Sequence, residues 1–258
     1  MSLADIFKVT RGTKVILAIT FSVSAAAILF AFFYYRSINR SEDPRIETAR
    51  RLLTEFEKIS AEKEGIGSFH YLDSAFSMFS RLPDYRLSFE TGVIYNNKSS
   101  ALLMKAIYDS TISLTEKQTL LDLSSRYCDS SIVVYKCWIS NWGNLTEEEV
   151  RERISPLMNR NDPAFYGLNF EKILKKRIRN IILAQTETPR RLSVSLTNRG
   201  TIFRHLSMPD SALHYFNLAL SLWKDNRIAE SNRSVLMGGD PVKPSLIESL
   251  FPPDKNKN

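Results

Sequence analysis

The chain has 258 residues, a formal net charge of +7 from 35 Lys and Arg against 28 Asp and Glu, and only 9 glycines. So few glycines argue against a β-rich fold with many tight turns. The sequence has no P-loop, GxGxxG, GxSxG or HExxH motif, which excludes the enzyme classes that those motifs mark. The basic balance suits nucleic acid, anionic lipid or an acidic protein as partner.

The first predicted element is an uncharged stretch near the N-terminus. Residues 15–35 carry no charged side chain, and Lys14 and Arg36 close the run at its two ends. As a helix this stretch would be about 31 Å long, enough to cross a hydrocarbon core of roughly 30 Å. We therefore predict a transmembrane helix at 15–35 behind a short cytoplasmic N-terminus at 1–14. A cleaved signal peptide is the competing interpretation.

Such an anchor predicts a single-pass protein of the inner (plasma) membrane. Basic residues flank the span on both sides, so the positive-inside rule does not decide its orientation. Long C-terminal domains behind an N-terminal anchor commonly translocate, so we expect a periplasmic or extracytoplasmic domain. Ala18, Ser22 and Ala26 recur every four positions, a spacing that would let two such helices approach closely and self-associate.

A polar linker at 36–45 separates this span from a helical domain at 46–226. Apolar residues recur at helical spacing over 46–59 and 69–82, with Gly65 and Gly67 between them, which predicts an αα-hairpin. The segments 115–118 and 146–149 both have the capping-box pattern of a helix start. Residues 130–142 have strand-like propensity, but their helical neighbours favour a buried helix.

The two cysteines, Cys128 and Cys137, stand nine residues apart. In an oxidising compartment they could form a disulfide if a turn brought their Cα atoms within about 7 Å. The interpretation that we favour is two small core residues on neighbouring helices. Without a CxxC or paired histidines, we expect no metal site and no cofactor.

A further helical stripe at 165–183 carries a dense group of basic residues opposite its apolar positions. The group comprises Lys172, Lys175, Lys176, Arg177 and Arg179. It is either a solvated helix face or a contact for an acidic protein surface or anionic headgroups, with Lys172, Lys175, Lys176 and Arg179 as candidate contacts. Aromatic residues do not interleave with these charges, so we expect no nucleic-acid partner.

Residues 193–226 carry one family signal. Small and large apolar residues alternate there in the order Leu196, Gly200, Phe203, Ala212, Phe216 and Ala219. This order resembles a tetratricopeptide repeat (TPR), a helix–turn–helix unit of 34 residues. Arg199, Ser207 and Lys224 depart from the usual repeat. The resemblance implies that these six residues pack two helices together, that the upstream hairpins are TPR-like, and that the activity is protein–protein interaction.

The last segment, 227–258, is predicted to be a flexible tail rich in Gly, Pro and polar residues. Within it, Leu246, Ile247, Leu250 and Phe251 keep helical spacing. These four residues are candidate partner contacts. They either dock back on the helical domain or form a linear motif for another protein.

Together these patterns predict an all-α fold, with an N-terminal transmembrane helix followed by an α-solenoid of TPR-like hairpins. We expect a non-enzymatic, membrane-anchored scaffold or adaptor of a bacterial cell-envelope assembly. Cell-wall machinery, a secretion system and the periplasmic part of a flagellar motor are examples. Its partners would be other cell-envelope proteins. The alternative is a cell-envelope enzyme or ligand carrier with a helical domain.

Overall fold

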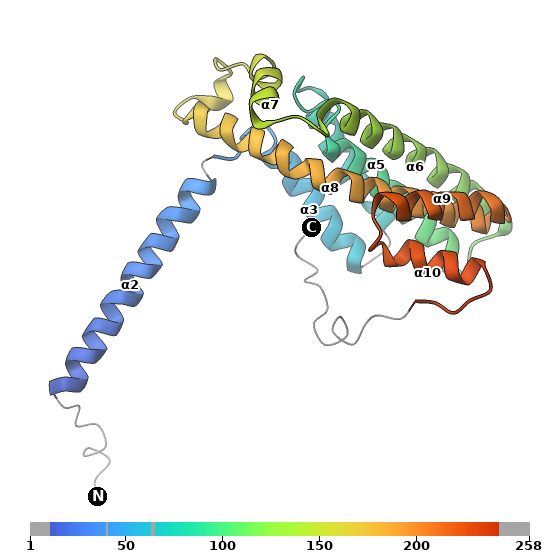
Figure 1. Cartoon of the computed structure of the whole chain (residues 1–258), viewed down its shortest axis with the longest axis horizontal. Helices are drawn as coiled ribbons and strands as arrows, with labels where there is room; N and C mark the ends of the chain where they lie inside the picture. Colours follow the sequence, from blue (N-terminus) through green and yellow to red (C-terminus); the bar gives the residue numbers. More distant parts are fainter. Residues whose placement is uncertain (1–10, 40, 63–64, 243–258) are drawn as a thin grey trace, which may run out of the picture.

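The structure, a computed structural model, describes the backbone of residues 11–39, 41–62 and 65–242, and the side chains of 15–31, 41–60 and 66–242. Within these ranges the protein is all-helical, with nine α-helices, three short 3-10 turns and no strand. Figure 1 shows an elongated body of packed helices, from which α2 (Arg11–Asn39) extends. The all-α prediction is confirmed.

The helix α2 covers the predicted membrane span, but its described side chains run only from Val15 to Ala31. Among the described residues, no helix is both long and apolar enough to cross a membrane. This finding overturns the predicted localisation, a single-pass inner-membrane protein with a periplasmic domain. The side chains at 32–35 of the predicted span lie outside the described part.

Three helical hairpins follow in chain order and form the body. They pair α3 (Glu47–Glu62) with α4 (Phe69–Ser80), α5 (Phe89–Tyr108) with α6 (Leu114–Trp142), and α8 (Phe170–His205) with α9 (Pro209–Leu222). The shorter elements are a 3-10 turn at Gly65–Ser68, α7 (Glu147–Ile154), 3-10 turns at Ser155–Leu157 and Pro163–Phe165, and α10 (Arg227–Leu236). Each hairpin packs on the next, because α4 contacts α5, α6 contacts α8, and α10 covers α9.

Two predicted helix starts have different outcomes. At Thr146 the capping box is confirmed: its hydroxyl accepts from the Glu149 amide at 3.3 Å, and the Glu149 carboxylate accepts from the Thr146 amide at 2.8 Å. The box predicted at Thr115 is wrong. Helix α6 begins after Ser113, whose hydroxyl accepts from the Glu116 amide at 3.1 Å, so Thr115 already lies within the first turn.

The long helix α6 settles two open alternatives. It includes residues 130–142, so their β-branched side chains belong to a helix, as predicted. It also contains both cysteines, which are free. Nine residues along a helix span about 13 Å, too far for a disulfide. The prediction that the two cysteines lie on neighbouring helices was wrong, although Cys128 is a fully buried core residue.

The helix predicted at 165–183 and the first helix of the predicted repeat are one helix, α8, of 36 residues. Pro189 lies inside it. A proline removes one backbone hydrogen bond and costs about 3 kcal/mol in a helix interior. Buried residues on both sides, including Ala184 and Leu192, hold α8 against its neighbours and offset this cost.

Regular structure also continues beyond the predicted end of the domain at residue 226. The Asn226 side chain accepts from the Ala229 amide at 3.1 Å and starts α10. Its amide group donates to the hydroxyls of Ser193 at 2.8 Å and Thr197 at 3.0 Å, both on α8. This buried contact fastens α10 to the body, so the predicted tail at 227–258 is wrong for its first ten residues, Arg227–Leu236.

Ser207 follows α8 with a φ of 59°, the left-handed region that favours glycine. It is also one of the positions that depart from the repeat pattern. We expect Ser207→Gly to raise the free energy of unfolding by about 0.5–1 kcal/mol, because a non-glycine side chain is strained there. The measurement is urea denaturation of the full chain. Ser130→Gly, at a half-buried position in the middle of α6, is the control and should lower stability. Equal effects would contradict the strain argument.

Candidate functional site

A groove runs along one face of α5. Its floor repeats every three or four residues, through Phe89, Val93, Asn97, Ala101, Met104 and Tyr108. Helix α3 forms one wall through Glu57, and α8 forms the other through Glu187 and Arg191. Three neighbouring cavities make up this α5 groove, and each shares two lining residues with the next. The groove therefore follows most of a helix that is about 30 Å long.

Helix α5 can form this floor because it is apolar on two faces. One face is buried against the core and carries Ile94, Leu102, Leu103 and Ala106. The groove face leaves Met104 55% exposed and Tyr108 73% exposed. This groove was not predicted from the sequence. A second apolar stripe on one helix was the signal that could have revealed it, because a helix needs only one such stripe for its core contact.

The end of the groove near Tyr108 is mainly apolar. It forms a cavity of about 690 Å³, within the usual range for ligand pockets. Phe56 from α3, Ile66 from the following turn, and Ala101, Met104 and Tyr108 from α5 supply its apolar lining. Asn97, Lys105 and Asp109 add polar groups. This part can accept bulky apolar side chains of a protein segment.

The centre of the groove is charged. Glu57 faces Arg190 and Arg191 across it, and Trp223 from the α9–α10 connection closes one side. Partial burial raises the pKa of the Glu57 carboxyl above its usual value, while the charge of Arg191 opposes this shift. Arg190 pairs with Glu187 at 2.9 Å. Charges of both signs at the centre can orient a bound segment while the apolar end supplies affinity.

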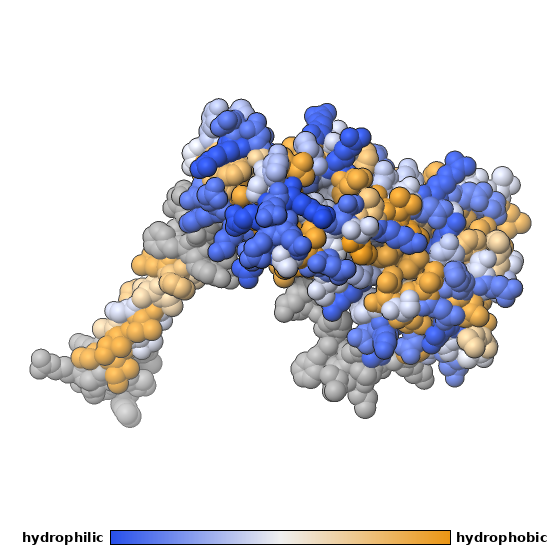
Figure 2. Space-filling view, turned by 45° about the horizontal axis from the view of Figure 1, so that its top comes forward, coloured by the Kyte–Doolittle hydropathy of each residue, from blue (hydrophilic) through white to orange (hydrophobic). Residues whose placement is uncertain are grey.

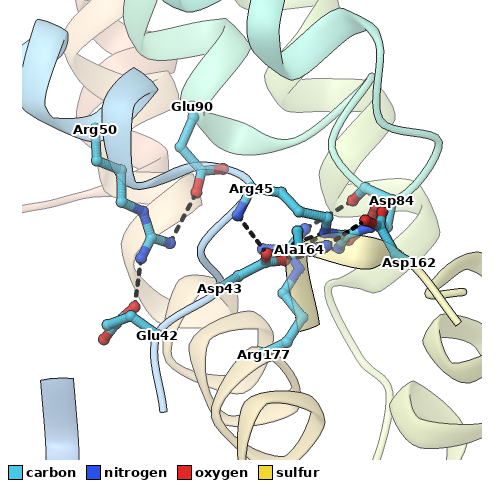
Figure 3. Close-up of polar contacts among 9 residues, drawn as sticks. All are labelled: Glu42, Asp43, Arg45, Arg50, Asp84, Glu90, Asp162, Ala164 and Arg177. Atoms are coloured by element: carbon cyan, nitrogen blue, oxygen red, sulfur yellow. Dashed lines mark hydrogen bonds and ion pairs between the residues drawn. The ribbon is translucent and has the colours of Figure 1, made fainter. Parts of the chain in front are cut away.

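A buried polar network holds the opposite end of the groove together (Figure 3). Arg45, just before α3, pairs with Asp43 at 2.7 Å and with Asp84 at 2.8 Å. Arg177 of α8 donates to the backbone carbonyl of Asp84 at 2.8 Å, and its guanidinium lies 3.7 Å from the Tyr85 ring centroid. The network thus joins the start of α3, the loop before α5, and α8.

A separate set of ion pairs around Arg50 lines this end of the groove. The Arg50 guanidinium pairs with Glu42 at 2.7 Å and with Glu90 at 3.3 Å, and all three residues line the end of the groove. Burial raises the pKa of the Asp84 carboxyl above its usual value, and the positive charges of Arg45 and Arg177 oppose the shift. These ion pairs set the positions of both walls relative to α5.

The predicted basic contacts lie elsewhere on α8. Lys172, Lys175 and Arg179 are exposed, and Lys176 is half-buried and pairs with Glu42 at 3.1 Å. Their neighbour Arg177 is only 4% exposed and belongs to the buried network. In Figure 2 hydrophilic residues dominate the part of the body nearest α2, where α7 and the first half of α8 lie. None of the four predicted contacts lines the α5 groove.

The residues of the predicted repeat lie at the contact between α8 and α9. Leu196, Gly200, Ala212, Phe216 and Ala219 are buried, and Phe203 is half-buried. The two helices are in tight contact at Gly200, where an added Cβ would lie 2.6 Å from the Phe216 ring. No larger residue fits there without movement.

The remaining predicted contacts are the apolar residues near the C-terminus and the small residues of α2. Leu246, Ile247, Leu250 and Phe251 lie outside the described residues. Ala18, Ser22 and Ala26 are exposed along α2, and self-association through them stays a prediction. In the described part of the chain, no three His, Cys, Asp or Glu side chains gather as a metal site would require.

Comparisons with protein-family models, with curated proteins and with solved structures found no match to this chain. The tetratricopeptide resemblance therefore rests on the residues of 193–226 alone and stays a prediction.

Proposed function

We propose that this protein is a scaffold or adaptor that acts by binding a segment of another protein in the α5 groove. The observation that carries the proposal is the continuity of the groove along α5. A partner segment of several helical turns could lie in it, whereas a small substrate would occupy only one of its cavities.

The packing of the three hairpins supports an α-solenoid organisation. Each hairpin packs on the next, and the groove is lined by the first helix of each, α3, α5 and α8. In solenoids, helices that repeat in this way create an extended concave surface for protein partners. The proposed TPR-like character of these hairpins rests on the residue pattern of 193–226.

The lining also suggests the kind of partner. The apolar end would accept the large apolar side chains of an amphipathic helix, and the charged centre would pair with its polar face. This lining favours a protein segment over the small polar ligand that a carrier or an enzyme would bind. Membership of a cell-envelope assembly followed from the predicted membrane span, so it is not part of this proposal.

A charge at the apolar end should weaken binding. We expect Met104→Asp in the full chain to lower the recovery of its partners in a pull-down at least tenfold, about 1.4 kcal/mol, because a carboxylate would be desolvated on binding. Met237→Asp is the control, since Met237 is 70% exposed and does not line the groove. Proteins recovered equally with both variants would place the binding surface elsewhere.

A further inference from the structure

We propose that the C-terminal segment 245–251 of this chain binds in the apolar end of its own α5 groove. A protein partner would then have to displace it. The inference uses the groove of the proposed function, but it concerns an occupant within the same chain and is tested separately.

The chain reverses its direction after α10. Gly238, at a φ of 85°, turns the chain at the end of this helix. The Ser234 hydroxyl then donates to the Asp240 carbonyl at 2.8 Å, and the Val242 amide donates to the Ser231 hydroxyl at 3.2 Å. The chain therefore runs back along α10 toward its first residue, as Figure 1 shows.

The C-terminal segment is long enough to reach the apolar end of the groove. From Ser231, the start of α10 at Arg227 is only about 6 Å further along the helix. Just before that start lies Trp223, which lines the centre of the groove. An extended chain spans up to about 14 Å between Val242 and Leu246 and about 30 Å between Val242 and Phe251. The apolar end adjoins the centre, with which it shares Glu57 and Asn97.

The segment also matches the apolar end of the groove in chemical character. Leu246 and Leu250 are four residues apart, as are Ile247 and Phe251, so a helix would present all four on one side. Ser245 and Glu248 have the spacing of a capping box at its start. The cavity offers a lining of matching character, through Phe56, Ile66, Ala101, Met104 and Tyr108.

Because the segment is joined to the rest of the chain by a short linker, even seven residues are enough to bind in the groove. Seven residues are too few for a stable helix in water, so the helix would form only on the groove. A short flexible linker holds its segment at an effective concentration on the order of millimolar. A contact with a dissociation constant of about 1 mM would therefore fill about half of the grooves, and an external partner would compete with it.

Disulfide trapping in the full chain tests this proposal. Met104→Cys is combined with Leu250→Cys in a Cys137→Ser background, and Cys128 stays because it is fully buried. The control combines Met237→Cys with Leu250→Cys. Met237 is exposed and lies only 13 residues from Leu250, so a freely moving tail would meet it more often. Mass spectrometry and gel mobility measure the rate of disulfide formation and separate monomers from dimers.

We expect the 104–250 disulfide to form within the monomer at least tenfold faster than the 237–250 disulfide. Adding Leu246→Asp, which leaves both cysteines in place, should remove this advantage while leaving the melting temperature unchanged. Trapping no faster than in the control would overturn the proposal, and so would a disulfide-linked dimer as the main product, which would assign the groove to a second copy. Either result leaves the effect of Met104→Asp on partner recovery as the separate test of the proposed function.

Discussion

Replacing Arg45 with methionine is expected to lower the free energy of unfolding by about 3–5 kcal/mol, the cost of removing one partner from a buried ion pair. The Arg45 side chain is 6% exposed and pairs with Asp43 and Asp84, whose side chains are 3% and 0% exposed. Methionine keeps much of the volume but leaves both carboxylates without this partner. Chemical denaturation of the full chain at neutral pH measures the loss.

The loss should also depend on pH. Burial already raises the pKa of Asp84, and removing Arg45 raises it further, because an opposing positive charge is lost. A carboxyl whose pKa is raised in the folded state costs stability once the pH exceeds its ordinary pKa, and the cost is complete above the raised pKa. The cost of Arg45→Met should therefore shrink from about pH 7 to about pH 4. Arg160→Met is the control, since Arg160 forms an exposed ion pair with Glu171 and should cost less than about 0.5 kcal/mol. Similar losses for the two variants would show that the buried network contributes no more to the free energy of unfolding than an exposed ion pair does.

The second large effect is expected at the contact between α8 and α9. Ala219 is fully buried, and its carbonyl accepts from the Ser193 hydroxyl of α8 at 2.7 Å. Ala219→Leu adds three carbon atoms where the helices leave no space, so we expect a loss of about 1–3 kcal/mol. The melting temperature of the full chain measures it.

Ala164→Leu provides the matched control, because Ala164 is exposed in the short turn before α8. Its effect should stay below about 0.5 kcal/mol. If the hairpins share stability as repeats do, hydrogen exchange in the Ala219→Leu variant should also rise in α6, which packs on α8. A variant that melts at the wild-type temperature would refute the close packing at Ala219 and the repeat register with it.

The apolar spacing of the sequence was enough to predict an all-α protein and the hairpin of α3 and α4. Helix formation depends on residues three and four positions apart, and those spacings are visible in the sequence. The capping box at Thr146 was predictable for the same reason, since its two partners are three residues apart. The resemblance to a tetratricopeptide repeat implied that Ala212, Phe216 and Ala219 pack against the partner helix, and all three are buried.

Contacts between distant segments were decided only by the tertiary structure. Arg177 looked like one more member of a basic helix face, and it is buried because Tyr85 and the Asp84 carbonyl, more than 90 residues earlier, surround it. A proline within a helical pattern commonly ends the helix, but α8 continues through Pro189 because it packs on both sides. The α5 groove likewise depends on contacts between distant segments. Its floor is a local stripe on one helix, but only the arrangement of α3 and α8 beside that helix makes it a groove, because spacing within a segment does not specify its neighbours.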